Sequence, residues 1–127
     1  MGIILGDLTR EDRDLKCNWW NWRPTLKLVE QSGVIDADRL ERMEYNGGGA
    51  EISAGEARQI ADFVDTEVLP NLRAQDEIKL DGKISDERRW LGPLSKAPST
   101  GSLYGANRQW LETFVRFCRE CNGFAVY

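Results

Sequence analysis

Apolar side chains recur three and four residues apart in four stretches of the chain, which is the spacing of one face of an α-helix. Polar residues fill the positions between them, as in helices that cover a core on one side only. The pattern predicts helices over approximately 21–32, 36–43, 53–69 and 107–121.

The first of these helices has signals at both ends. Asn21 is a favourable N-cap, Pro24 would then fall in the first turn, where its missing N–H is harmless, and Gly33 suits the left-handed position after the last turn. Its apolar face consists of Trp22, Leu26 and Val29, with Trp19 just upstream.

The third helix has the strongest start signal. Ser53 and Glu56 match a capping box, in which each side chain accepts from the backbone N–H of the other residue, and Ile52 precedes them for a staple contact. The helix is expected to run to about residue 69, because Pro70 either kinks it or ends it. The segment 71–80 is compatible with further helical turns.

The second and last helices are amphipathic as well. Asp36 is the N-cap of the second, with Leu40 and Met43 facing inward. The last begins near Asn107 and ends at Asn122–Gly123. Its broad apolar stripe consists of Trp110, Leu111, Phe114, Phe117, Cys118 and Cys121.

Short apolar segments at both ends of the chain predict strands. Residues 3–5 are Ile-Ile-Leu, and residues 124–127 alternate as Phe-Ala-Val-Tyr. Residues 7–16 are charged and are interpreted as a connector or irregular turn, which leaves the two end segments as partners. The predicted fold is mainly α within the α+β class: a compact helical domain of about four helices, with a small two-stranded sheet pairing the N- and C-termini.

Glycine and proline mark the connections. Asn46–Gly49 is the clearest loop, and Asp81–Gly82 is a turn signal, after which residues 85–87 can cap a short helical turn that carries Trp90. Residues 92–105 are rich in Pro, Ser and Gly and predict a mobile loop within a single domain, 1–127.

Composition limits the classes of partner. The 127 residues include 17 basic and 21 acidic ones, a net charge of −4, and the basic ones are scattered apart from Arg88–Arg89. Binding to nucleic acid normally needs a basic face. No segment resembles a signal peptide or approaches the length of a membrane span. We expect a cytoplasmic protein that binds neither nucleic acid nor membrane.

The chain contains no histidine, which removes the commonest general base and every Ser–His or Cys–His nucleophile pair. Carboxylates could act in pairs if burial shifted their pKa values, for example Asp62 with Asp65 or Glu51 with Glu56. Charged positions on helix faces are more often solvated. A carboxylate-based hydrolase is therefore a third hypothesis, and enzymatic activity is not favoured.

The three cysteines are Cys17, Cys118 and Cys121. An odd number without a secretion signal indicates reduced thiols. The C-x-x-C formed by Cys118 and Cys121 falls at the end of a helix, where the helix dipole opposes a thiolate, and a zinc site would lack histidine and a second C-x-x-C. The pair is expected to be packed in the core. No metal or other cofactor is predicted.

Three of the five tryptophans lie between Trp19 and Trp22. Trp20 points about a quarter turn away from the apolar face, beside Arg23 at i+3, and is the indole expected to be partly exposed. Trp and Arg are enriched among interface hot spots, so these two residues are candidates for a binding surface. Large aromatic residues also stabilise cores. The simplest core arrangement packs Trp19 and Trp22 against Trp110 and Phe114.

The glycine loop offers a second candidate site. Backbone N–H groups at Asn46, Gly47 and Gly48 precede a helix N-terminus, which attracts anions. The Gly-Lys-Ser/Thr of a P-loop is missing, and a plain turn is favoured. With a tryptophan to stack on a base, the loop would suit a nucleotide-like ligand. Trp90 completes the set of partner- or ligand-binding candidates.

Three segments also carry a likeness to known proteins: the N-W-x-x-W-R-like run from Asn18 to Arg23, the start of the third helix at 52–54, and residues 117–124, which end in Gly-Phe. In this arrangement the chain resembles small uncharacterised bacterial and phage proteins. It departs from them at Asn122–Gly123, where two glycines are expected, and in the apparent insertion at 91–106. The resemblance implies one folded domain and no particular activity.

The first functional hypothesis is a non-enzymatic binding protein of inhibitor, immunity or regulatory type. It would recognise a partner protein through Trp20, Arg23 and neighbouring loop residues. The alternative is a module that sequesters a nucleotide-like small molecule. A homo-oligomer is compatible with either hypothesis.

Overall fold

The computed structural model describes residues 2–10, 12–44, 49–74, 76–80, 82–85 and 105–127. Within these ranges the chain has an α+β architecture with four α-helices and two antiparallel sheets. The helices are α1 (Trp19–Ser32), α2 (Ala37–Met43), α3 (Ala54–Phe63), which is extended by the π-helical η1 (Val64–Val68) and the 3₁₀-helical η2 (Leu69–Asn71), and α4 (Arg108–Glu120). The strands are β1 (Gly2–Asp7), β2 (Asp14–Asn18), β3 (Glu51–Ile52), β4 (Glu77–Ile78), β5 (Ile84–Ser85), β6 (Ala106–Asn107) and β7 (Phe124–Val126).

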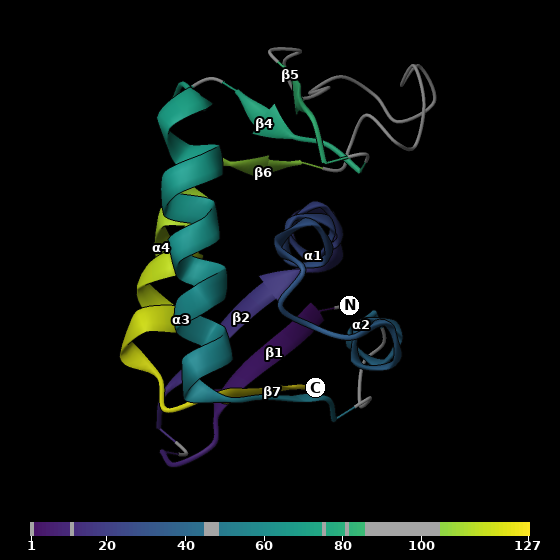
Figure 1. Ribbon diagram of the computed structural model, residues 1–127, viewed down its shortest axis with the longest axis vertical. Coiled ribbons are helices and arrows are strands. Elements are labelled where there is room, and N and C mark those ends of the chain that lie inside the picture. The colour runs from purple at the N-terminus through teal and green to yellow at the C-terminus, as the bar shows by residue number, and fades with distance from the viewer. Residues whose placement is uncertain (1, 11, 45–48, 75, 81, 86–104) are drawn as a thin grey trace.

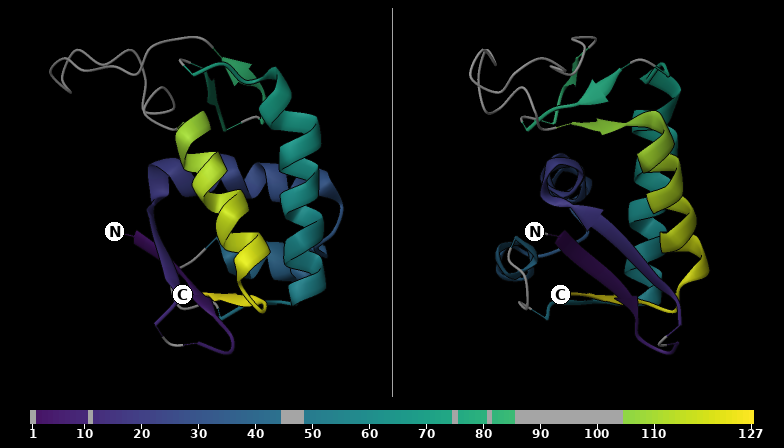
Figure 2. Two further views of the ribbon diagram at one scale, coloured as in Figure 1. Left: turned by 90° about the vertical axis from the view of Figure 1, so that its left-hand side faces the viewer. Right: turned by 180° about the vertical axis from the view of Figure 1, so that it is seen from behind.

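Helix α1 lies between the two sheets (Figure 1). Helices α3 and α4 stand side by side and run from one sheet to the other, and α1 crosses behind them (Figure 2). Helix α2 follows α1 and lies beside it on the side away from α3 and α4 (Figure 1). The core fills the space enclosed by α1, the α3–α4 pair and the larger sheet.

The larger sheet has the order β2-β1-β7-β3, and all its pairs are antiparallel. The predicted pairing of the two ends of the chain is confirmed, because Leu5 lies opposite Val126 and Asp7 opposite Phe124. The predicted number of strands was too low: β2 and β3 extend the sheet from two strands to four.

Strand β2 corrects the interpretation of residues 7–16 as a connector. Asp14, Lys16 and Asn18 are exposed, whereas Leu15 is half-buried and Cys17 is buried. This alternation places one face of the strand on the core and the other in solvent. Two apolar positions among charged residues gave too short a pattern to predict the strand from sequence.

The second sheet has the order β5-β4-β6. Its β4 strand lies in the segment 71–80, for which further helical turns were expected, so that prediction was wrong. The predicted turn at residue 82 is confirmed: Gly82 has φ +78° and donates its N–H to the Lys79 carbonyl at 2.8 Å. Each strand of this sheet has only two residues, which is shorter than any periodic signal.

Helix α1 begins three residues earlier than predicted. Asn18, rather than Asn21, is the N-cap, and its side chain accepts the N–H of Asn21 at 2.8 Å. Pro24 therefore lies inside the helix, where it leaves the carbonyl of residue 20 without its intrahelical donor. The Gly105 N–H takes that place, bonding the Trp20 carbonyl at 2.9 Å. The proline thereby provides an attachment point for the chain that leads into β6.

The other predicted helix ends are confirmed. Gly33 ends α1 with φ +72°, Asp36 caps α2 by accepting the N–H of Arg39, and Asn107 caps α4. Ser53 and Glu56 form the complete capping box at the start of α3, with bonds of 3.1 and 3.0 Å. Helical backbone continues through η1 and η2 as far as Asn71, past Pro70.

Trp22 is the largest of the fully buried side chains, with 1% of its surface exposed. Its indole N–H donates to the Met43 carbonyl at 2.8 Å, and its ring meets the edge of Phe114 with 6.3 Å between centroids. Phe114 also stacks on Trp110, whose indole N–H donates to the buried Thr25 hydroxyl at 2.7 Å. The prediction that Trp22 packs with Phe114 in the core is confirmed.

Replacing Trp22 with Phe removes an indole donor and leaves both a cavity and an unpaired Met43 carbonyl. We expect Trp22→Phe to lower the free energy of unfolding by about 2–4 kcal/mol, measured by urea denaturation. Trp110→Phe is the matched control, because Trp110 is half-buried and water can reach part of its site. Equal losses for the two variants would contradict the central packing role of Trp22.

Candidate functional site

A hollow of about 390 Å³ opens between α1 and α2. We call it the α1–α2 groove. Both helices contribute to its lining, together with Leu80, which lies two residues after β4. The lining residues are Arg23, Leu26, Lys27 and Glu30 from α1, Ala37, Leu40, Glu41 and Glu44 from or directly after α2, and Leu80.

The groove follows from the antiparallel packing of α1 and α2. The left-handed Gly33 and the capping Asp36 leave a connection of only four residues, 33–36, which returns the chain alongside α1. The Trp22–Met43 hydrogen bond then fixes the start of α1 opposite the end of α2. Each helix contributes residues at positions i, i+3, i+4 and i+7, which is one face of a helix.

Leucines form the apolar part of the groove. Leu26 is buried, Leu40 is half-buried against the core, and Leu80 is 41% exposed. The turn that carries Leu80 is seated on α1, because a Cβ atom at Gly82 would lie 2.3 Å from the Gln31 Nε2 atom. Glycine at this position, with φ +78°, keeps the approach open, and the β4–β5 turn places Leu80 in the apolar lining of the groove.

Arg23 is held at the edge of the groove by an indole. Its guanidinium carbon lies 4.8 Å from the centre of the Trp19 ring, a cation–π contact between positions i and i+4. The expected neighbour of Arg23 was Trp20, so the structure corrects the partner by one residue. Within the described ranges, the buried Nε of Arg23 has no hydrogen-bond acceptor and the guanidinium has no carboxylate partner.

The other charges around the groove differ in their pairing. Lys27 forms an ion pair with Glu30 at 3.2 Å. Glu41 and Glu44 are exposed, and neither forms an ion pair with a residue in the described part of the chain. Among the described residues, a cation without an ionic partner therefore lies on α1, and two carboxylates without one lie at the opposing end of α2.

The six residues expected to form a site divide into three groups. Arg23 lines the groove. Trp20 is half-buried in α1, where its carbonyl bonds Gly105, and it is not among the lining residues. Asn46, Gly47, Gly48 and Trp90 lie outside the described residues, as does the predicted mobile loop up to residue 104. Of the predicted helix cap at 85–87, Ser85 lies in strand β5, and residues 86 and 87 are outside the described ranges.

Sequence reasoning missed most of the groove. Leu26 and Leu40 were assigned to the core-facing stripes of their helices, Lys27 was not singled out, and Leu80 was expected in a further helical turn. The capping Asp36, four residues after the end of α1, was the signal that could have found the site. It predicts a short connection and hence two adjacent helices with facing stripes.

The carboxylate pairs proposed from sequence do not form dyads. Asp62 and Asp65 are exposed and share the guanidinium of Arg119, at 3.1 Å each. Glu56 forms a two-pronged ion pair with Arg39, at 2.8 and 2.7 Å, and Glu51 is exposed. The hydrogen bonds from Arg39, aided by those of Ser53 and opposed by burial, lower the pKa of Glu56 to about 2. A general acid would need the opposite shift.

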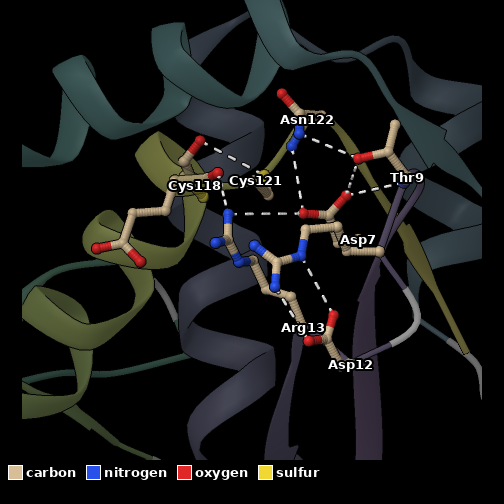
Figure 3. A network of polar contacts seen from close by, with 9 residues as sticks. Asp7, Thr9, Asp12, Arg13, Cys118, Cys121 and Asn122 are labelled. Atoms are coloured by element: carbon tan, nitrogen blue, oxygen red, sulfur yellow. Dashed lines mark hydrogen bonds and ion pairs between the residues drawn. The ribbon is translucent and has the colours of Figure 1, made fainter.

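A buried carboxylate, that of Asp7, lies where the β1–β2 hairpin meets the end of α4 (Figure 3). Burial raises its pKa, but hydrogen bonds from the Thr9 backbone and hydroxyl and from the Asn122 backbone, with the charge of Arg13, outweigh burial and leave the pKa lowered. Arg13 also donates to the Glu120 carbonyl. This network ties the hairpin to the end of α4 and holds the carboxylate in its ionised form.

The predicted burial of Cys118 and Cys121 is confirmed, and Cys17 is buried as well. Burial raises the pKa of Cys17 to about 12 and that of Cys118 well above its usual range, and it also raises the pKa of Cys121. Thiols with such pKa values stay protonated at neutral pH and are poor nucleophiles. Within the described ranges, no cluster of three or more Cys, Asp or Glu side chains is arranged to hold a metal ion.

Comparisons with protein-family models, with curated proteins and with solved structures found no match to this chain. The resemblance to small bacterial and phage proteins therefore stays a prediction. None of the helices in the described part of the chain is long and apolar enough to cross a membrane.

The Glu56–Arg39 pair gives stability a defined pH dependence. A carboxylate whose pKa is lowered from 4.5 to about 2 on folding stabilises the protein above pH 4.5, and this contribution is lost as the pH falls towards 2. We expect Glu56→Gln to reduce the free energy of unfolding by about 1–3 kcal/mol at pH 6 and much less at pH 2.5.

Urea denaturation across this pH range would measure the difference. The control is Glu51→Gln, which changes an exposed carboxylate that forms no ion pair with any of the residues that the structure describes. A Glu56→Gln effect that is the same at both pH values would show that the ion pair does not stabilise the fold.

Proposed function

We propose that this protein is a non-enzymatic binding protein that recognises a partner protein through the α1–α2 groove. The observation that carries the proposal is the groove itself, an open hollow with leucines inside and unpaired charges at its edges. The proposal retains Arg23 from the Trp20–Arg23 surface inferred from sequence. It moves the surface from Trp20 towards Leu26, Leu40 and Leu80.

The composition of the groove is that of a protein interface. Interfaces combine an apolar centre with a polar rim, and arginine is enriched among the residues that carry binding energy. Here the leucines form the centre, and Arg23, Glu41 and Glu44 form the rim. The arginine is held in place by Trp19 before any partner arrives, which reduces the entropy lost on binding.

The charge of the groove favours a protein segment over a nucleotide-like ligand. Two basic and three acidic side chains line it, and Lys27 is already paired with Glu30. A polyphosphate would meet two unpaired carboxylates, Glu41 and Glu44, against a single unpaired cation. A peptide segment can present both signs of charge and apolar side chains together.

A pair of matched substitutions tests the proposed function. Random peptides displayed on phage would be selected on the wild-type protein, and their dissociation constants measured on variants. We expect Leu80→Asp to weaken binding of the selected peptides at least tenfold, because it places a carboxylate at the apolar centre. Ile84→Asp should leave binding unchanged. It makes the same kind of change at a side chain of similar exposure, 43% against 41%, on the same hairpin but outside the groove.

Two results would contradict the proposal. One is a selection that yields no specific peptide. The other is a set of peptides that bind Leu80→Asp as tightly as the wild-type protein. A thermal shift with nucleotides that is abolished by Leu80→Asp would instead support the small-molecule alternative.

A further inference from the structure

We infer that the segment bound in the α1–α2 groove is an amphipathic helix with opposite charges on its two sides, one carboxylate for Arg23 and one cation for Glu41 and Glu44. This inference rests on the proposed function and specifies the chemistry of the partner. It depends on the placement of unpaired charges across the groove.

The guanidinium of Arg23 is positioned to bind a carboxylate. The Trp19 ring supports one face of it, and within the described ranges its donors have no acceptor. A buried donor without a partner costs about 1–3 kcal/mol. A carboxylate from outside would pair with the guanidinium through charge-assisted hydrogen bonds, which are about twice as strong as neutral ones. None of the described residues supplies a carboxylate to Arg23.

Glu41 and Glu44 lie at the end of α2 where negative charge is least favourable. Glu41 belongs to the last turn and Glu44 is the C-cap, so both face the negative end of the helix dipole. Arg42, also in the last turn, is paired with Asp38 at 3.6 Å. A cation on the partner would relieve the repulsion at Glu41 and Glu44.

The two sets of charges face each other across the groove. The Trp22–Met43 hydrogen bond places residue 23 across from residue 44, yet Arg23 and Glu44 do not form an ion pair. Opposite charges that line the same groove without pairing suit an occupant that carries both signs. One face of the partner would supply the apolar side chains, and its two flanks would supply the charges.

The dimensions of the groove suit a helix. The lining residues of α1 run from position 23 to position 30, which is two turns and about 10 Å of helix. A helix laid in this groove would present two apolar side chains three or four residues apart towards the leucines. It would pack on α1 and α2 as a third helix of a bundle.

Charge reversal on both sides of the interface tests the inference. A peptide selected on the wild-type protein would be synthesised with its acidic residue changed to Lys, and its dissociation constant measured on the wild-type protein and on Arg23→Glu. We expect the changed peptide to bind the wild-type protein at least tenfold more weakly, and Arg23→Glu to restore most of that loss. In the same way, a peptide whose basic residue is made acidic should bind the wild-type protein more weakly. The double variant Glu41→Lys, Glu44→Lys should restore most of that loss.

Arg58→Glu is the control, because Arg58 is an exposed arginine on α3, away from the groove. It should change none of these affinities by more than twofold. The substitutions in the peptide leave the protein intact, so that arm stays informative even if a protein variant fails to fold.

The outcomes separate the inference from the proposed function. If Leu80→Asp abolishes binding but the charge reversals show no restored affinity, the groove binds a partner and the inferred charges are wrong. Selected peptides without both an acidic and a basic residue flanking the apolar positions would also overturn the inference. If Leu80→Asp has no effect, the proposed function itself fails.

Discussion

The buried indole of Trp22 fixes the relative positions of three helices. Its N–H reaches the Met43 carbonyl at the end of α2, and its ring meets Phe114 on α4. An indole N–H left unpaired in the core would be costly, so α2 is held where its last carbonyl can accept the bond. The α1–α2 groove exists because this contact brings the helices together at one end while the four-residue connection joins them at the other.

A second constraint comes from Pro24, which frees a carbonyl that Gly105 then occupies. This bond attaches the chain leading into β6 and α4 to the first turn of α1. Together with the network around Asp7 at the opposite end of α4, it places both ends of the last helix against the N-terminal third of the chain. Contacts between the two ends of the sequence therefore position α1, on which the groove is built.

Local sequence signals predicted most of the helices. The start of α1 and the short strands depend on contacts between elements that are distant in the sequence. The capping box at Ser53 and the glycine at 33 act over a few residues, so their outcome could be predicted from sequence. The start of α1 was misplaced because Asn18 and Asn21 are both good caps, and only the hairpin that ends at Asn18 selects between them. The two-residue strands were missed because their pairing depends on partners far away in the chain. Arg23 is the groove residue that was predicted as part of a site. The other lining residues are of ordinary types, and they become a candidate site because the fold brings them together.

We propose that the face formed by α1, α2 and the turn at Leu80 is a preformed binding surface. Nuclear magnetic resonance with ¹⁵N-labelled protein and a selected peptide tests this directly by mapping which backbone amides change their chemical shift. We expect the changes to cluster in residues 22–30, 37–44 and 79–83, with few in α4. Changes centred on α4 and η1, or on the open face of the larger sheet, would contradict it.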